Sequence, residues 1–136
     1  MHELSVEAKV ENLDNVLDFV NERIEHCTMK IQSQIGIVID EVFANISAYA
    51  YKPDVGGVIV RVKVENNGIV LEFEDSGIPF NPLSTDDPDT TLDIDERDVG
   101  GLGVFMVKNI MDSVEYIRNG NKNILTIKNQ SGINTF

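Results

Sequence analysis

The chain has 136 residues and a formal net charge of −12, with 11 Lys and Arg against 23 Asp and Glu. This length suits one domain with a core of its own, which we expect over residues 1–136, and the charge disfavours nucleic acid as a partner because most of the surface would repel a phosphate backbone. Cys27 is the only cysteine, which excludes an internal disulfide and a cysteine-based metal cluster and favours the reducing cytoplasm as the compartment.

The N-terminal part of the chain is predicted to form a strand and two helices. Residues 1–10 lack the basic and then apolar stretch of a signal peptide, and residues 4–10 alternate apolar and polar side chains, as a half-buried strand does. From Asn12, which we expect to be an N-cap, apolar residues recur at helical spacing as far as Cys27. A second helical stretch covers about 29–50. No apolar run approaches the length of a membrane span, so no membrane association is expected.

Two hairpins are predicted farther along the chain. Residues 58–64 and 69–73 alternate on either side of Asn67-Gly68, and Asn-Gly between such runs is a strong hairpin signal. The segments VEYIR and ILTIK, separated by Asn119-Gly120, repeat this pattern near the end of the chain. Both pairs are therefore expected to be antiparallel.

A long segment without periodicity separates the two hairpins. Asn81 to Val99 is rich in Asp, Pro and Thr, and a compact domain seldom keeps so long a loop unless it is a lid or a binding loop. A short helix is expected from Gly103 to Asp112. The order of elements, a strand, two helices, two strands, a helix and two strands, predicts an α/β (α+β) two-layer sandwich, with helices on one face of a mixed, mostly antiparallel sheet.

The first candidate site residue is Asp75, in the sequence EDSGIPFNP at the end of a predicted strand. In an extended strand Asp75 shares a face with Leu71 and Phe73, so its carboxylate is expected to point toward the helix layer, where it needs hydrogen-bond donors. One interpretation is that Asp75 accepts bonds from backbone N–H groups of its own turn. The other is a ligand site, because Gly77 has no side chain and would let a flat ligand approach the backbone.

Glu41 and Asn45 form the second candidate. They lie four residues apart, hence on one face of the predicted second helix, beside its apolar stripe. They could form a solvated edge with a local hydrogen bond. The functional interpretation is that the amide oxygen of Asn45 coordinates a hard cation such as magnesium, while Glu41 takes a proton or orients a hydroxyl.

The third candidate is the glycine cluster GGLG at 100–103, which runs directly into the predicted helix. Backbone N–H groups at such a helix start can bind an anion without a lysine, although a flexible end of the loop would have the same composition. Neither the P-loop motif nor a dinucleotide-binding G-x-G-x-x-G motif is found in the chain.

In order and spacing, these three motifs resemble the N, G1 and G2 boxes of the GHKL ATP-binding superfamily. The motifs are Glu41-x-x-x-Asn45, then Asp75-Ser-Gly77-Ile-Pro-Phe80, then the GGLG cluster. Within that superfamily the chain is most similar to the small anti-sigma factor serine kinases of the RsbW and SpoIIAB type. The resemblance covers nearly the whole chain, and it implies the histidine kinase-like ATPase fold with ATP and magnesium (Mg2+) as cofactors.

The resemblance also implies a role for each matching residue. Asp75 would accept a hydrogen bond from the adenine amine, Gly77 would let the base lie close, and Phe80 would shape the pocket or anchor the lid. Asn45 would hold magnesium and Glu41 would act as general base. Backbone N–H groups of the glycine cluster would bind the phosphates, through Gly101, Leu102 and Gly103. The loop at 81–99 would be the ATP lid, in which Arg97 is the one cation and could instead pair with a neighbouring acid.

Three functions follow from the resemblance. The first is a cytoplasmic bacterial protein serine/threonine kinase that phosphorylates an anti-anti-sigma (STAS-type) antagonist and sequesters a sigma factor, as a homodimer. The second is a non-catalytic module whose protein binding is gated by ATP, although retention of Glu41 favours the first. The third, a sensor histidine kinase fragment, is disfavoured because the chain has no room for a dimerisation helix pair.

Overall fold

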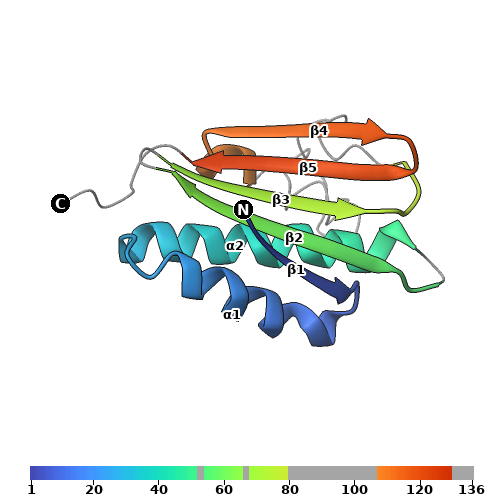
Figure 1. Ribbon diagram of the computed structural model, residues 1–136, viewed down its shortest axis with the longest axis horizontal. Coiled ribbons are helices and arrows are strands. Elements are labelled where there is room, and N and C mark those ends of the chain that lie inside the picture. Colours follow the sequence, from blue (N-terminus) through green and yellow to red (C-terminus); the bar gives the residue numbers. More distant parts are fainter. Residues whose placement is uncertain (52–53, 66–67, 80–106, 130–136) are drawn as a thin grey trace, which may run out of the picture.

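The computed structural model describes residues 1–51, 54–65, 68–79 and 107–129. They form a two-layer α+β fold in which helices α1 (Leu13–Arg23) and α2 (Met29–Asn45) lie on one face of a five-stranded sheet (Figure 1). The sheet order is β1-β2-β3-β5-β4, and each of these strand pairs is antiparallel. The predicted fold class is confirmed. Within the described ranges no helix has the length and hydropathy needed to cross a membrane.

Both predicted hairpins are present. The strands are β1 (His2–Glu7), β2 (Gly57–Glu65), β3 (Gly68–Asp75), β4 (Ser113–Asn119) and β5 (Lys122–Asn129). The β4–β5 turn lies one residue later than predicted, since Asn119 pairs with Lys122 and leaves Gly120-Asn121 between the strands. Gly120 has a φ of 62°, which a glycine at the first central position of a two-residue hairpin turn adopts readily.

The first strand is shorter than the alternating sequence pattern predicts. β1 ends at Glu7, and the chain then enters a 3-10 turn, η1 (Val10–Asn12). Ala8 remains buried, and its N–H bonds to the carbonyl oxygen of Gly56 at 2.8 Å. Val10 is 67% exposed, so the prediction that it belongs to the buried face of a strand is wrong.

A side-chain cap explains where α2 begins, but α1 begins without one. Asn12 occupies the N-cap position of α1, as predicted, but its side chain caps no backbone N–H of the helix. Its Oδ1 instead accepts from the side-chain Nδ2 of Asn15 at 3.3 Å, and its Nδ2 donates to the Glu7 carbonyl at 2.9 Å. Thr28 caps α2, because its hydroxyl oxygen accepts from the N–H of Ile31 at 3.3 Å. α2 continues as a wider π-helical turn, η2 (Ile46–Ala50), and so ends where predicted.

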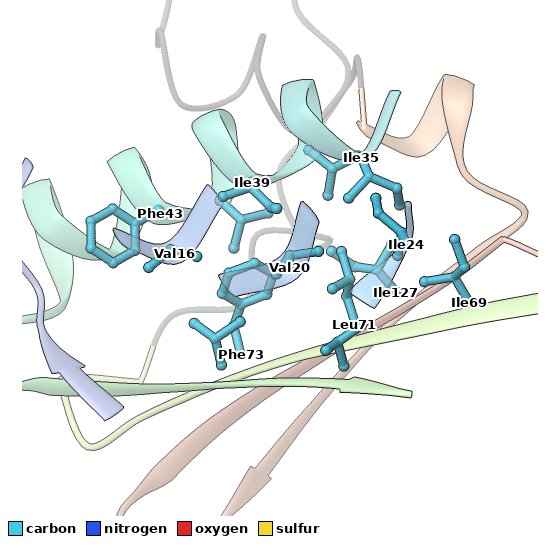
Figure 2. Close-up of a cluster of buried hydrophobic side chains, with 14 of the residues drawn as sticks. Val16, Val20, Ile24, Ile35, Ile39, Phe43, Ile69, Leu71, Phe73 and Ile127 are labelled. Atoms are coloured by element: carbon cyan, nitrogen blue, oxygen red, sulfur yellow. The ribbon is translucent and has the colours of Figure 1, made fainter. Parts of the chain in front are cut away.

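The core lies between the two helices and the sheet. Figure 2 shows apolar side chains of α1 and α2 meeting those of β3 and β5, among them Val20, Ile39, Phe43, Leu71 and Phe73. The short helix predicted from Gly103 is described only at 107–110, where Val107 also enters the core. α2 runs along the sheet, and its C-terminal end therefore lies at the same end of the sheet as the C-terminus of β3 (Figure 1).

Candidate functional site

Asp75 is the last residue of β3 and lies on the face of the sheet that the helices cover. In the sheet it stands between Val58 on β2 and Asn123 on β5. Its exposed fraction is 6%, and it shares the buried face with the core residues Ile69, Leu71 and Phe73, each at most 1% exposed. The sequence-based prediction that this acid points inward is confirmed.

The carboxylate of Asp75 uses its two oxygens differently. Oδ1 accepts the backbone N–H of Gly77 and the side-chain Nδ2 of Asn123, each at 2.9 Å. Among the residues that the structure describes, Oδ2 accepts no hydrogen bond. The acid therefore bonds to its own turn, as one interpretation of the sequence holds, but this bond occupies only one of its oxygens. Within the described part of the chain, Oδ2 is therefore not engaged.

Asn123 and Arg118 form a polar group beside Asp75 that the sequence did not reveal. Asn123 Nδ2 also donates to the carbonyl of Ile78 at 2.8 Å, and its Oδ1 accepts from Arg118 Nη1 at 3.1 Å. The same Nη1 donates to the carbonyl of Gly77 at 2.9 Å. The signal that could have identified these residues is the strand register, which sets Asp75, Asn123 and Arg118 opposite one another on three adjacent strands.

The turn after β3 is tied to the C-terminal end of the second helical segment. The N–H of Ile78 bonds to the carbonyl of Ala50 at 2.9 Å. The hydroxyl of Tyr51 accepts the N–H of Ser76 at 2.7 Å and donates to the carbonyl of Gly57. The pKa of Tyr51 is raised above its usual value, mainly by burial. The hydroxyl therefore stays protonated at neutral pH and can donate a hydrogen bond.

Gly77 lies against the backbone of Ala50. A Cβ at position 77 would stand 2.2 Å from the Ala50 carbonyl oxygen and 2.6 Å from its carbonyl carbon. This close approach of two backbones is sufficient reason for a glycine. The predicted role of Gly77 toward a ligand stays a prediction.

Glu41 and Asn45 project from the flank of α2, and both are half-buried. Within the described part of the chain, neither side chain makes a hydrogen bond or an ion pair. Asn45 ends α2, and Ala50, five residues on, bonds to the turn that follows Asp75. The helical segment that carries Asn45 therefore ends, at Ala50, against the turn that follows Asp75.

The other predicted site residues lie outside the described residues, as does the proposed lid at 81–99. They are Phe80, Arg97, Gly101, Leu102 and Gly103. Their roles stay predictions. The described residues hold no group of three or more His, Cys, Asp or Glu that could bind a metal ion by itself.

Two solved structures share the fold. The histidine kinase domain of the blue-light activated histidine kinase EL346 from Erythrobacter litoralis matches with a TM-score of 0.55 at 17% identity, over 88% of this chain and 59% of that one. The histidine kinase AdeS of Acinetobacter baumannii matches with a TM-score of 0.53 at 15% identity, over 99% of this chain and 70% of that one.

Relatives in sequence carry the name serine-protein kinase RsbW. The protein from Bacillus cereus (strain AH820) is 27% identical over 96 residues, which are 68% of this chain and 60% of the relative. The protein from Bacillus thuringiensis (strain Al Hakam) is 24% identical over the same shares. The chain thus spans about 60% of the length of the curated relatives that it matches. The family described as histidine kinase-like ATPase domain matches residues 6–128, and the chain belongs to this family.

Proposed function

We propose that the chain is an ATP-dependent anti-sigma factor serine/threonine kinase, which phosphorylates an anti-anti-sigma (STAS-type) antagonist and sequesters a sigma factor. The observation that carries the ATP-binding part is the buried Asp75, of which Oδ1 is fully engaged and Oδ2 has no partner among the described residues. The serine kinase part is supported by the similarity to proteins named RsbW.

Asp75 would select the base of the nucleotide. A carboxylate only accepts hydrogen bonds, so its free Oδ2 suits the exocyclic amine of adenine and disfavours a base with a carbonyl in that place. Burial strengthens this preference, because little water competes for the oxygen. Phe80 and Gly77 are proposed to border the base.

Asn45 would hold magnesium through its amide oxygen, at the end of α2. Magnesium, when bound, would supply positive charge that offsets the negative charge of the phosphates. Because the net charge of −12 repels a triphosphate, groups that lie close to the phosphates have to bind it. We propose that these groups are the backbone N–H groups of Gly101, Leu102 and Gly103 and the side chain of Arg97.

Glu41 would act as general base. It lies one helical turn before Asn45. Its carboxylate would take the proton of an incoming serine hydroxyl. The serine oxygen would then form a bond to the γ-phosphorus as the bond from the γ-phosphorus to ADP breaks. Because phosphoryl transfer depends mainly on positioning and charge neutralisation, this sparse set of groups is sufficient.

The remaining parts of the proposal are a single ATP-binding domain over residues 1–136 with the lid at 81–99, a homodimeric state and a bacterial cytoplasmic location. They are supported by the family match over residues 6–128 and by the similarity to the RsbW proteins. Neither nucleic acid nor a membrane is proposed as a partner.

Replacing Asp75 with asparagine tests the base assignment. The oxygen of the new amide would keep the bonds from Gly77 and Asn123, so its NH2 group would face the adenine amine and two donors would meet. Loss of a hydrogen bond to a charged group is expected to lower ATP affinity by about 10- to 100-fold, while GTP affinity changes less. Calorimetric titration of both nucleotides measures this. Asp18→Asn, at an exposed position of α1, is the matched control. If Asp75→Asn leaves the ratio of ATP to GTP affinity unchanged, Asp75 does not bind the base.

Replacing Asn45 with alanine tests the metal assignment. Titrations of ATP with magnesium and with excess chelator should show that the variant loses about tenfold in affinity only when magnesium is present, since one coordinate bond is removed. Gln34→Ala is the control because it deletes an amide from the same helix about 16 Å away along the axis. If the unchanged chain binds ATP equally with and without magnesium, Asn45 has no metal to hold.

A further inference from the structure

Asn123 is a buried amide whose hydrogen-bonding capacity is completely used. Its exposed fraction is 6%, and it lies on β5 directly opposite Asp75. Its two N–H bonds go to Asp75 Oδ1 and to the carbonyl of Ile78, and its oxygen accepts from Tyr116 and from Arg118. Two donors and two lone pairs are all that a side-chain amide has.

Arg118 determines which way this amide points. A guanidinium only donates, so the atom of Asn123 that faces Arg118 has to be the oxygen. The NH2 group is then directed to the other side, where Asp75 only accepts. The O and N atoms of the Asn123 amide, which look alike in most structures, are therefore assigned by the chemistry of Arg118 and Asp75.

The fixed amide in turn holds the carboxylate of Asp75. Oδ1 is engaged by donors from two different segments, Asn123 on β5 and the N–H of Gly77 in the turn. Rotation of the carboxylate would break both bonds inside a buried site, which is costly. Among the described residues, Oδ2 is thereby left as the one oxygen of Asp75 that a ligand can use.

Arg118 also connects the turn after β3 to the hairpin of β4 and β5. Its Nη1 donates to the carbonyl of Gly77 at 2.9 Å, and its Nε donates to the carbonyl of Gly120 at 3.0 Å. It lies on β4, at the edge of the sheet, and is half-buried. One side chain therefore orients Asn123 and fixes the backbone beside Asp75.

We propose that Arg118 and Asn123 are positioning residues that set the selectivity of the site for a purine with an amine at position 6. This inference rests on the proposed function, because it assumes that Asp75 binds the base. Neither residue is proposed to touch the nucleotide. They act by presenting a single acceptor oxygen of Asp75 in one orientation, so their loss should reduce discrimination between bases more than binding of the triphosphate.

The test compares ATP with inosine triphosphate, which has the same sugar and phosphates and carries a carbonyl at position 6. Asn123→Leu removes the donor to Asp75, and its ratio of ATP to inosine triphosphate affinity is expected to fall about tenfold, with most of the loss in ATP affinity. Arg118→Met should change the ratio in the same direction, and Arg118→Lys should restore part of it because an ammonium still donates. Lys63→Gln, an exposed position of β2 whose ion pair with Glu65 lies at the surface, controls for the loss of one positive charge.

The outcomes separate this inference from the proposed function. If the unchanged chain binds neither nucleotide, the proposed function fails and the inference fails with it. If the unchanged chain prefers ATP but the variants discriminate equally well, or lose both nucleotides equally, only the inference is overturned. Should Asn123→Leu not fold, as thermal unfolding would show, the comparison of Arg118→Met with Arg118→Lys decides.

Discussion

A chain in which glutamine replaces Glu41 is expected to bind Mg–ATP as tightly as the unchanged chain and to transfer the phosphoryl group about 10²- to 10⁴-fold more slowly, the usual contribution of a general base. Glutamine keeps the size of the side chain but cannot take a proton. Glu41 is half-buried and bonds to no described residue, so the change should leave the fold intact. The measurement follows labelled γ-phosphate into an antagonist protein that is isolated with the chain from native extract.

Asp40→Asn is the matched control for this prediction, because Asp40 is an exposed neighbour on the same helix and its change removes the same charge. A Glu41→Gln variant that phosphorylates the antagonist at the normal rate would show that Glu41 is not the base. An unchanged chain that binds ATP but phosphorylates nothing would favour the nucleotide-gated binding module, even if Glu41 supports slow ATP hydrolysis.

Gly77→Ala is expected to lower the free energy of unfolding by about 2–4 kcal/mol, from overpacking and from the loss of a backbone hydrogen bond. The added methyl group would overlap the Ala50 carbonyl, at 2.2 Å from its oxygen. The turn would have to move away, which breaks the bond from the Ile78 N–H to Ala50 and displaces the backbone beside Asp75. ATP affinity should therefore fall together with stability. Urea unfolding measures the first effect and calorimetric titration the second.

Gly36→Ala is the control for this substitution. Nothing lies within 4 Å of a Cβ at position 36, which is inside α2. Alanine is a better helix former than glycine by about 1 kcal/mol, so this variant should be as stable as the unchanged chain or more stable. A Gly77→Ala chain that unfolds at the same urea concentration as the unchanged chain would mean that the turn does not press against Ala50.

Much of the fold was predictable because its signals are local. The alternation in β2 and β3 follows from burial of one face, and the same parity correctly placed Asp75 inward. Periodicity was less informative about the end of α1. Ile24 and Cys27 continue the apolar spacing and are buried, yet the helix ends at Arg23. Core packing selects apolar residues whether or not the backbone is helical.

The bond of Asp75 to its own turn was one interpretation of the sequence, but its partner Asn123 was not predicted, because that bond depends on contact between distant parts of the chain. Asn123 lies 48 residues after Asp75 and becomes its neighbour only because β5 pairs with β3. Gly77 gave a similar difficulty. Its sequence context suggested an approach by a ligand, which stays a prediction, but did not indicate the close approach of Ala50 that the structure shows. The hydrophobic pattern and the turn residues indicate on which face of a strand or helix a side chain lies, but not which other segment of the chain it contacts there.

A crystal structure of the chain with magnesium and a slowly hydrolysed ATP analogue would test most directly whether Asp75 receives the base. The account predicts that the adenine amine lies about 2.7–3.2 Å from Oδ2, while Oδ1 keeps its bonds to Gly77 and Asn123. A structure in which main-chain N–H groups occupy both oxygens and the base is bound elsewhere would contradict it.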